Sequence, residues 1–454
     1  MKVRDKKVGV LGLGKSGIAA ANLLYRLGAK VFISEINEQS SLEGLSGNFE
    51  IEVGVHSQRV LENDLIVISP GINPDIPIIK EAKRLNIPII SEIELAFSFL
   101  NGQRLVSVTG TNGKTTVTTF IGEVMKNEGR KTVVAGNIGY PLCKAVEGLN
   151  QDAILVTEIS SFQLENIDKF RPQISLLLNI TEDHLDRYFD MEEYTRAKIN
   201  IFKNQQKGDF ILLNADNFRI KNLDLKTPAK IIYFSTQIKV KEGIYVWDNK
   251  IISNIKGNEE FICGIEDLKI KGRHNLENVL AVVGVSVLLD VNRNVLRRTI
   301  SSFSGLEHRL EEVRKISGVT YLNDSKATNI DAMIRALESF SDPIILIAGG
   351  RDKKGNFILL RDLIAKKVRK IILLGEAKEK IKNLLGDCVE THLVKDLSQA
   401  VNLSYTLAEE GDIVLLSPGC SSYDMFSNFE ERGKCFKEEV LKLESRIKQD
   451  ALSL

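Results

Sequence analysis

A glycine-rich loop at residues 109–116, Thr-Gly-Thr-Asn-Gly-Lys-Thr-Thr, constrains the fold more than any other segment of this chain. The apolar run 104–108 before it predicts a strand, and the run after it predicts a helix. In such a unit, backbone N–H groups, the helix N-terminus and the Lys114 ammonium converge on one place, which suits a di- or triphosphate. We therefore predict an ATP-type nucleotide site, with the Thr115 hydroxyl placed to bind Mg²⁺.

The loop is shorter than the general P-loop pattern, which requires a further glycine where this chain has Val108. The alternative interpretation is a glycine turn with an incidental lysine. The order of strand, Gly-Lys-Thr-Thr and helix favours the nucleotide site. The loop residues predicted to bind ATP are Gly110, Thr111, Asn112, Gly113, Lys114, Thr115 and Thr116.

The length of 454 residues predicts roughly two to four domains. A net charge of +1 provides no charge-driven attraction to nucleic acid or membrane, so we expect neither partner. The start of the chain is basic but leads into an apolar run that glycines interrupt, so we expect no signal peptide. The five cysteines are scattered and form no Cys-x-x-Cys pair, which favours a reducing, cytoplasmic location.

A second glycine turn, Gly-x-Gly-x-x-Gly at residues 12–17, lies between the predicted strand Lys7–Leu11 and a predicted helix at 18–27. This is the dinucleotide-binding pattern, and Glu35 follows where a carboxylate would contact ribose hydroxyls. Alone it favours an NAD-dependent oxidoreductase. The pattern indicates only that a pyrophosphate fits the turn, so another nucleotide diphosphate, or a turn without ligand, stays open.

Strand and helix patterns alternate through the whole chain and predict an α/β fold of three domains, at 1–99, 100–304 and 305–454. Near-continuous apolar runs such as 174–178 predict a parallel sheet that is buried on both faces. A β-rich stretch at about 231–270 follows. The predicted strands of the second and third domains are 104–108, 132–135, 153–158, 174–179, 210–213, 344–348, 370–374 and 413–417.

Two polar residues in the central domain follow predicted strands. Glu158 would face the same sheet edge as the glycine-rich loop and complete a shell of oxygen ligands around Mg²⁺. The alternative is an acid that stabilises a helix N-terminus. His184 lies in Asn-Ile-Thr-Glu-Asp-His after a strand, where a functional histidine and a structural one are both possible.

Lys198 falls inside an apolar stripe at helical spacing with Tyr194, Ala197, Ile201 and Phe202. One interpretation is a lysine whose head extends to water along the apolar surface. The other is a buried functional lysine whose surroundings favour the neutral amine. The residues themselves do not decide between the two.

The third domain opens with Leu-Glu-His-Arg at 306–309 and Asn-Asp-Ser-Lys-Ala-Thr-Asn at 323–329. The second segment places a carboxylate, an ammonium and hydroxyls on one short turn. A solvated loop is the alternative interpretation. The more specific interpretation is that an arginine and a lysine of these segments neutralise a phosphoryl group during its transfer.

In chain order, these segments make the sequence resemble the Mur ligases, the ATP-dependent enzymes that add amino acids to the muramoyl peptide of peptidoglycan. The matching segments are TGTNGKTT at 109–116, TEISSFQLE at 157–165, NITEDHLDRY at 179–188, GRHNLEN at 272–278, LEHR at 306–309 and NDSKATN at 323–329. Within the family, EISSFQL and SPGCSSYDMFSNFEERG at 417–433 most resemble members that add D-glutamate to UDP-N-acetylmuramoyl-L-alanine.

The resemblance implies a Rossmann-like N-terminal domain for the UDP substrate, a central P-loop ATPase domain with a parallel sheet, and a Rossmann-like C-terminal domain for the amino acid. It implies carboxylate activation by ATP and attack of the D-glutamate amine on an acyl phosphate. Small molecules would be the only partners, and we expect a monomer. Other amino-acid-adding Mur ligases and, in a different class, the oxidoreductase remain alternatives.

The resemblance also assigns roles to residues. The catalytic set is Lys114, His184, Lys198 and Lys326, and the ATP contacts outside the loop are Asn275, Arg309, Asp324 and Lys326. The UDP-substrate contacts are Gly14, Lys15, Ser16, Glu35, Ser69, Gly71, Asn137 and His184. The D-glutamate contacts are Thr328, Lys353, Ser422 and Phe429, with Lys354 as a competitor of Lys353. The Mg²⁺ ligands are Thr115, Glu158, His184 and Lys198, the last as a carbamate that supplies an anionic oxygen.

Overall fold

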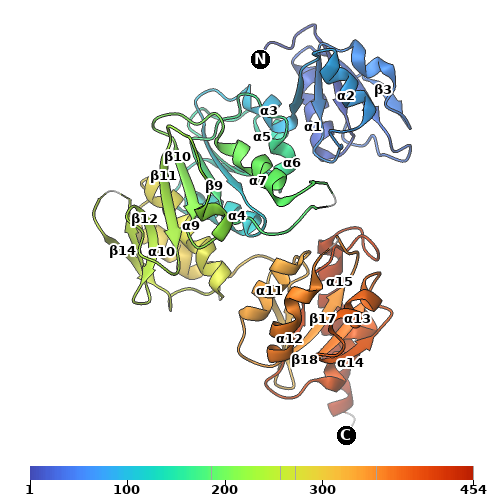
Figure 1. The fold of residues 1–454 in the computed structure, drawn as a ribbon, viewed down its shortest axis with the longest axis vertical. Coiled ribbons are helices and arrows are strands. Elements are labelled where there is room, and N and C mark those ends of the chain that lie inside the picture. The colour runs from blue at the N-terminus through green and yellow to red at the C-terminus, as the bar shows by residue number, and fades with distance from the viewer. Residues whose placement is uncertain (186, 256, 271, 354, 453–454) are drawn as a thin grey trace. The chain divides into compact units, whose positions relative to one another are not determined.

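The computed structural model describes residues 1–452 except 186, 256, 271 and 354. It contains three β-sheets with helices on their faces (Figure 1), one in each predicted domain. The described chain forms two compact units. The first comprises Met1–Ile180, Glu192–Asp267 and Glu277–Ser301, and the second comprises Thr181–Met191, Leu268–Leu276 and Ser302–Leu454.

The N-terminal sheet is entirely parallel, with strand order β3-β2-β1-β4-β5. The chain runs through β1 (Lys7–Leu11), α1 (Lys15–Arg26), β2 (Lys30–Glu35), β3 (Glu50–Val53), η1 (Gln58–Glu62), β4 (Leu65–Ile68), α2 (Pro77–Arg84) and β5 (Ile89–Ser91). The predicted helix at 18–27 begins earlier, because Gly14 is its N-cap and α1 follows the glycine turn directly. The sequence did not reveal β3 and β5, which are short and lack a buried apolar run.

Helix α3 (Glu92–Phe97) joins the N-terminal sheet to the central one through two buried carboxylates. Glu94 accepts the backbone N–H groups of residues 168–170 at 2.8–3.0 Å. Glu92 accepts the Cys143 N–H at 2.5 Å, and burial raises the pKa of its carboxyl to about 7. Three charge-assisted hydrogen bonds to one buried carboxylate tie α3 firmly to the segment before β9.

The central sheet has the order β14-β13-β12-β11-β10-β9-β6-β8-β7 and is parallel from β7 to β12. Its strands are β6 (Arg104–Thr109), β7 (Thr132–Gly136), β8 (Ile154–Glu158), β9 (Ile174–Leu177), β10 (Phe210–Asn214), β11 (Lys230–Ser235), β12 (Gly243–Trp247), β13 (Lys250–Asn254) and β14 (Glu260–Gly264). The predicted β-rich stretch is thus confirmed as β11 to β14, in which the last two strand pairings are antiparallel.

The helices of the central domain are α4 (Lys114–Asn127), α5 (Leu142–Ala145), α6 (Ser161–Leu164), α7 (Met191–Ile199), η2 (Asn200–Phe202), α8 (Phe218–Lys221), α9 (Arg273–Leu288) and α10 (Arg293–Ser302). Helix α9 is largely apolar, and its residues from Glu277 to Val287 are buried. Among the residues that the structure describes, no helix has the length and apolar content needed to cross a membrane.

The C-terminal sheet has the order β15-β16-β20-β17-β18-β19, and only the β15–β16 pair is antiparallel. Its elements are β15 (Glu311–Ile316), β16 (Val319–Asn323), α11 (Ile330–Glu338), β17 (Ile344–Gly349), η3 (Phe357–Leu360), α12 (Arg361–Lys367), β18 (Val368–Leu374), α13 (Lys378–Leu385), β19 (Glu390–Leu393), α14 (Leu397–Leu407), β20 (Ile413–Leu416) and α15 (Phe429–Leu452). One core packs α11, α12 and α13 on a face of the sheet, and a second core packs α14 and α15 on the other.

Candidate functional site

The glycine-rich loop connects β6 to α4 as predicted, and its geometry depends on glycine. Gly113 is the N-cap of α4 with a left-handed φ of 83°. A Cβ at this position would lie 2.5 Å from the Asn278 side-chain oxygen. The Asn179 side chain binds the loop backbone at Asn112: the Asn112 N–H donates to Asn179 Oδ1 at 2.7 Å, and Asn179 Nδ2 donates to the Asn112 carbonyl at 3.0 Å. The loop backbone is therefore held in place by the strand-end segment after β9.

Two lysines from different elements donate to carbonyls of this loop. Lys114 Nζ donates to the carbonyls of Gly110 and Thr111 at 2.9 and 2.8 Å. Lys198 Nζ donates to the same Gly110 carbonyl at 2.8 Å and lies 4.5 Å from the centre of the Tyr194 ring. The Lys198 side chain is 1% exposed, so its head does not extend to water as one interpretation required. Helix α7 ends at Ile199, so the apolar stripe predicted around Lys198 continues into the η2 turn with Ile201 and Phe202.

Glu158 ends β8 beside the loop, since β6 and β8 pair with Val108 opposite Glu158. Its carboxylate is 2% exposed, and Oε1 accepts a hydrogen bond from Asn137 Nδ2 at 2.8 Å. Within the described residues, Oε2 is buried and has no hydrogen-bond partner. A buried carboxylate oxygen without a partner is costly, and a hard cation would satisfy it.

The protein groups available to Mg²⁺ here are few. No cluster of three His, Cys, Asp or Glu side chains that could hold a metal ion occurs among the described residues. The residues near the loop therefore fit an ion that also takes oxygens from a nucleotide. Glu158 and Thr115, in the first turn of α4, are the protein groups that could bind it. Carbamylation of Lys198 would add one more anionic oxygen.

The first glycine turn is stabilised by two residues predicted to bind the UDP substrate. The Ser69 hydroxyl donates to the Gly12 carbonyl at 3.0 Å. The Glu35 carboxylate is buried and accepts the N–H groups of Leu13 at 2.6 Å and Asn37 at 2.9 Å. Both oxygens of Glu35 therefore bind backbone, which gives this residue a structural role in the turn that the sequence did not indicate.

The other predicted UDP contacts of this domain lie around the start of α1. Gly14 is the N-cap of α1, and Lys15 and Ser16 form its first turn, which contains no acidic residue. Gly14, Lys15 and Gly71 are exposed, and Ser16 is half-buried. A helix N-terminus with one exposed lysine suits a diphosphate.

Three loops of the C-terminal domain carry three of the four residues predicted for D-glutamate and part of the ATP site; the fourth, Phe429, begins α15. They follow β16, β20 and β17, which are neighbours in the sheet, so their carboxyl ends meet at one edge. Backbone hydrogen bonds join the loops, from Gly419 to the Ala327 carbonyl at 2.9 Å and from Gly349 to the Pro418 carbonyl at 3.0 Å. Thr328, Ser422 and Lys353 thus come from three adjacent loops, whereas Lys354 lies outside the described residues.

Asp324 and Lys326, on the loop after β16, have distinct environments. Asp324 is buried and accepts hydrogen bonds from the Leu310 N–H at 3.3 Å and the Ser417 hydroxyl at 3.1 Å. Burial raises the pKa of its carboxyl to about 7, against the lowering effects of Ser417 and the Arg309 charge. Lys326 Nζ lies 3.7 Å from the centre of the Phe429 ring, a cation–π contact that places two predicted site residues together.

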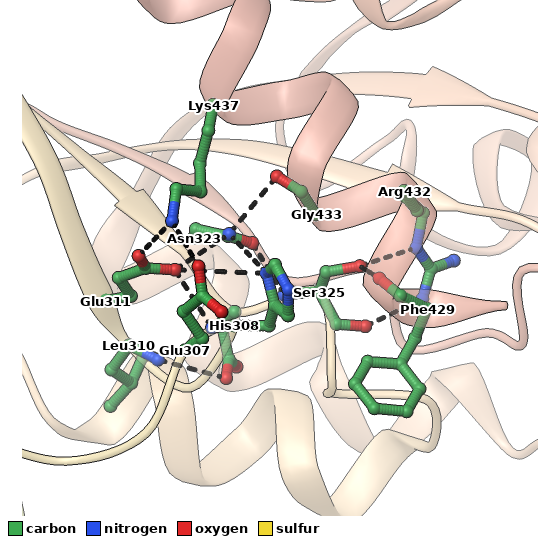
Figure 2. A network of polar contacts seen from close by, with 11 residues as sticks. Glu307, His308, Leu310, Glu311, Asn323, Ser325, Phe429, Arg432, Gly433 and Lys437 are labelled. Carbon is green, nitrogen blue, oxygen red and sulfur yellow. Dashed lines mark hydrogen bonds and ion pairs between the residues drawn. The ribbon is translucent and has the colours of Figure 1, made fainter.

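A polar network holds the start of α15 against these loops (Figure 2). The buried Arg432 guanidinium donates to the Ser325 hydroxyl at 3.0 Å, to the Ser325 carbonyl at 2.8 Å and to the Cys420 carbonyl at 3.2 Å. The Ser325 hydroxyl in turn donates to the Phe429 carbonyl at 2.8 Å. We did not predict a role for Arg432, although it lies in the resembling segment 417–433.

The same network includes His308, which precedes Arg309 in the Leu-Glu-His-Arg segment. The His308 ring nitrogen Nδ1 lies 2.9 Å from Asn323 Nδ2. The backbone N–H of His308 donates to the Glu311 carboxylate at 2.9 Å. Lys437 of α15 pairs with Glu311 at 2.5 Å (Figure 2). His308 has a left-handed φ of 63°, so these contacts hold a strained turn, in which the Arg309 N–H donates to the Leu306 carbonyl at 3.2 Å.

The remaining predicted residues belong to the second compact unit. His184 has a left-handed φ of 58°, and its backbone N–H donates to the Asp183 carboxylate at 2.9 Å. Asn275 begins α9, where its N–H donates to the Gly272 carbonyl at 3.1 Å. Both residues thus lie in segments that belong to the same compact unit as the C-terminal sheet.

Comparison with protein families gives matches along nearly the whole chain. Residues 6–91 match the model of the Mur ligase MurD-like N-terminal domain. Residues 108–286 match the Mur ligase middle domain, and residues 308–420 match the Mur ligase glutamate ligase domain. The matched segments contain the three sheets in the order predicted from the sequence.

Two curated relatives match over almost their full length. The UDP-N-acetylmuramoylalanine--D-glutamate ligase of Clostridioides difficile (strain 630) is 42% identical over 448 residues, covering 97% of this chain and 99% of the relative. The protein of the same name from Koribacter versatilis (strain Ellin345) is 43% identical over 455 residues, covering 99% of this chain and 100% of the relative.

Solved structures share the fold at lower identity. The MurF ligase from Thermotoga maritima in complex with ADP has a TM-score of 0.62 at 17% identity and covers 97% of this chain and 96% of its own. The UDP-N-acetylmuramate-alanine ligase from Thermotoga maritima has a TM-score of 0.58 at 20% identity and covers 96% of this chain and 99% of its own. These similarities confirm the predicted α/β fold of three domains.

Proposed function

The chain belongs to the Mur ligase family, and from this premise we propose that it joins D-glutamate to UDP-N-acetylmuramoyl-L-alanine at the expense of ATP, in the synthesis of the peptidoglycan precursor. The observation that carries the choice of substrates is the identity of 42% over 97% of the chain to a relative named for that reaction. The residues that follow the carboxyl ends of the strands in the three sheets are suited to bind a UDP group, a triphosphate and an amino acid, respectively.

The phosphoryl transfer takes place at the glycine-rich loop. The terminal carboxylate of the L-alanyl group attacks the γ-phosphorus of ATP, the bond to the β-phosphate oxygen breaks, and ADP leaves. Lys114, whose ammonium already lies at the loop carbonyls, neutralises charge on the phosphates during the transfer. Further contacts of the nucleotide are proposed for Asn275, Arg309, Asp324 and Lys326.

Mg²⁺ is proposed to bind where a buried carboxylate oxygen has no partner among the described residues. Glu158 and Thr115 would hold the ion, with His184 and a carbamate on Lys198 as further ligands. When bound, the ion neutralises phosphate charge and makes the phosphorus easier to attack. The hydrogen bond from Asn137 orients Glu158 and leaves its second oxygen for the ion.

The second step uses the C-terminal sheet. The D-glutamate amine attacks the acyl carbon, the C–N bond forms, and phosphate leaves with the former carboxylate oxygen while the amine releases its proton. Lys353 and the hydroxyls of Thr328 and Ser422 are proposed to hold the two substrate carboxylates, with Phe429 at the start of α15. The UDP substrate is proposed to bind at Gly14, Lys15, Ser16, Glu35, Ser69 and Gly71, with Asn137 and His184 as contacts of its muramoyl peptide.

We place this reaction in the cytoplasm. The five cysteines are free in the structure, which suits a reducing compartment.

The alternative function from a different class, an NAD-dependent oxidoreductase, is supported by the first glycine turn alone. It would need no ATP and would release no phosphate.

Oxygen-18 labelling tests the proposed course of the reaction. With ¹⁸O in the L-alanyl carboxylate, we expect one labelled oxygen in each phosphate released, because the acyl phosphate breaks at the acyl carbon. The label is followed by the mass of the phosphate. Amide formation that leaves the phosphate unlabelled would contradict carboxylate activation, and turnover without ATP would favour the oxidoreductase.

A further inference from the structure

Asp183 lies between two loops of the proposed amino-acid site, although it comes from the segment after β9. This segment, Thr181–Met191, belongs to the same compact unit as the C-terminal sheet. The Asp183 side chain is 9% exposed, and its carboxylate lies 3.7 Å from Lys353 Nζ. Asn329 Nδ2 donates to Asp183 Oδ2 at 3.1 Å, and the same oxygen lies 3.7 Å from His184 Nε2.

Asn329 connects Asp183 to the loop after β16. Its side-chain oxygen accepts the Ala332 N–H at 2.8 Å and thereby caps α11, while its Nδ2 donates to Asp183. Both ends of the amide are therefore used, which fixes its orientation. Because Asn329 directly follows Thr328, the position of Asp183 is linked to a residue proposed to bind the substrate.

The contact with Lys353 has a geometry suited to positioning. At 3.7 Å it is an ion pair and not a hydrogen bond, so the N–H groups of Lys353 remain able to donate to a substrate carboxylate. A lysine has a flexible four-carbon stem, and ordering it costs entropy. The Asp183 carboxylate is mostly buried, and it is held by Asn329 and by the His184 N–H at 2.9 Å. It is therefore a fixed charge that orders the Lys353 side chain.

Resting on the proposed function, we propose that Asp183 is a positioning residue of the amino-acid site, which holds the Lys353 ammonium toward a carboxylate of the incoming amino acid. Asp183 acts through Lys353 and makes no contact with the substrate in this account. The segment that supplies His184 would thus also set the affinity for the amino acid.

The test is the Asp183→Asn variant in the full-length protein. We expect its KM for D-glutamate to rise about tenfold, which corresponds to about 1.4 kcal/mol. The KM for ATP and for the UDP substrate should change less, because the amide oxygen of Asn can still accept the His184 N–H. Asp183→Glu keeps the charge and should recover part of the loss. In the double variant with Lys353→Met, Asp183→Asn should add little to the effect of Lys353→Met alone.

Asp352→Asn is the matched control. Asp352 directly precedes Lys353 but pairs with Lys380 at 2.5 Å and accepts the Gly355 N–H at 2.8 Å, so its loss removes the same charge without the contact to Lys353. We expect its KM for D-glutamate to stay near the wild-type value. An equal rise in both variants would overturn the proposal, since a general loss of charge would then explain it.

Glutarate carries the two carboxylates of glutamate but no amine. It therefore distinguishes positioning of Lys353 by Asp183 from direct binding of the substrate's amino group by Asp183. We expect inhibition by glutarate to weaken in Asp183→Asn by the same factor as D-glutamate binding. Unchanged inhibition by glutarate, or an unchanged KM for D-glutamate, would overturn the proposal. If wild-type protein does not use D-glutamate at all, the proposed function fails instead, so the two failures are distinguishable.

Discussion

Replacement of Lys114 by alanine is expected to lower ATP-dependent phosphate release about a thousandfold, since one positioned donor to a developing charge is worth about two to three decades in rate. Lys114 is the ammonium of the glycine-rich loop, and it donates to two carbonyls of that loop. Binding of UDP-N-acetylmuramoyl-L-alanine, measured by calorimetry, should stay close to wild type, because the proposed UDP contacts around α1 belong to a different sheet.

Lys126→Ala provides the control for Lys114→Ala. Lys126 is exposed in the last turn of the same helix α4, so its loss changes the charge and helix propensity but not the loop. We expect normal turnover from this variant. Turnover of Lys114→Ala within tenfold of wild type would contradict the assignment of the loop as the site of phosphoryl transfer.

Replacement of Lys198 by alanine is expected to lower turnover by about two to three decades, and added short carboxylates such as formate or acetate should restore about a tenth of it or more. The side chain is 1% exposed, and its head reaches the Gly110 carbonyl at 2.8 Å, so a truncation leaves space beside the loop. A small carboxylate in that space would replace the anionic oxygen of the proposed carbamate.

The rescue distinguishes a carbamate from an ammonium that only holds the loop. If Lys198 acts as an ammonium, a small amine should rescue the variant and a carboxylate should not. Lys203→Ala is the control, because Lys203 is exposed in the turn after η2 and its loss should not respond to either additive. Full activity of Lys198→Ala without any additive would contradict both roles.

The sequence allowed the βα units to be predicted because each strand runs directly into a glycine or polar turn. The loop at 109–116 and the turn at 12–17 both lie where expected. The hairpin of β15 and β16 was not predicted, because its strands are partly exposed and its turn is only Ser317-Gly318. The left-handed φ values of 48° and 80° at these residues show the tight turn that joins them.

Contacts between segments far apart in the chain set the limit of prediction for the site. Nothing in the sequence indicates that β20 inserts between β16 and β17, which brings the three C-terminal loops together. Arg432 and Asp183 could not be assigned for the same reason, since their partners are set by that packing. Glu35 fits the ribose-binding pattern, yet only the structure shows both oxygens bound to backbone N–H groups.

The most direct test of the proposed function is phosphate release by the full-length protein with ATP, Mg²⁺, UDP-N-acetylmuramoyl-L-alanine and a panel of amino acids. The product is identified by its mass. We predict strong stimulation by D-glutamate, a product heavier by one glutamyl residue, and little stimulation by L-glutamate, L-alanine, L-lysine or diaminopimelate. Equal or greater amide formation with another amino acid of the panel, or no dependence on the UDP substrate, would contradict the account.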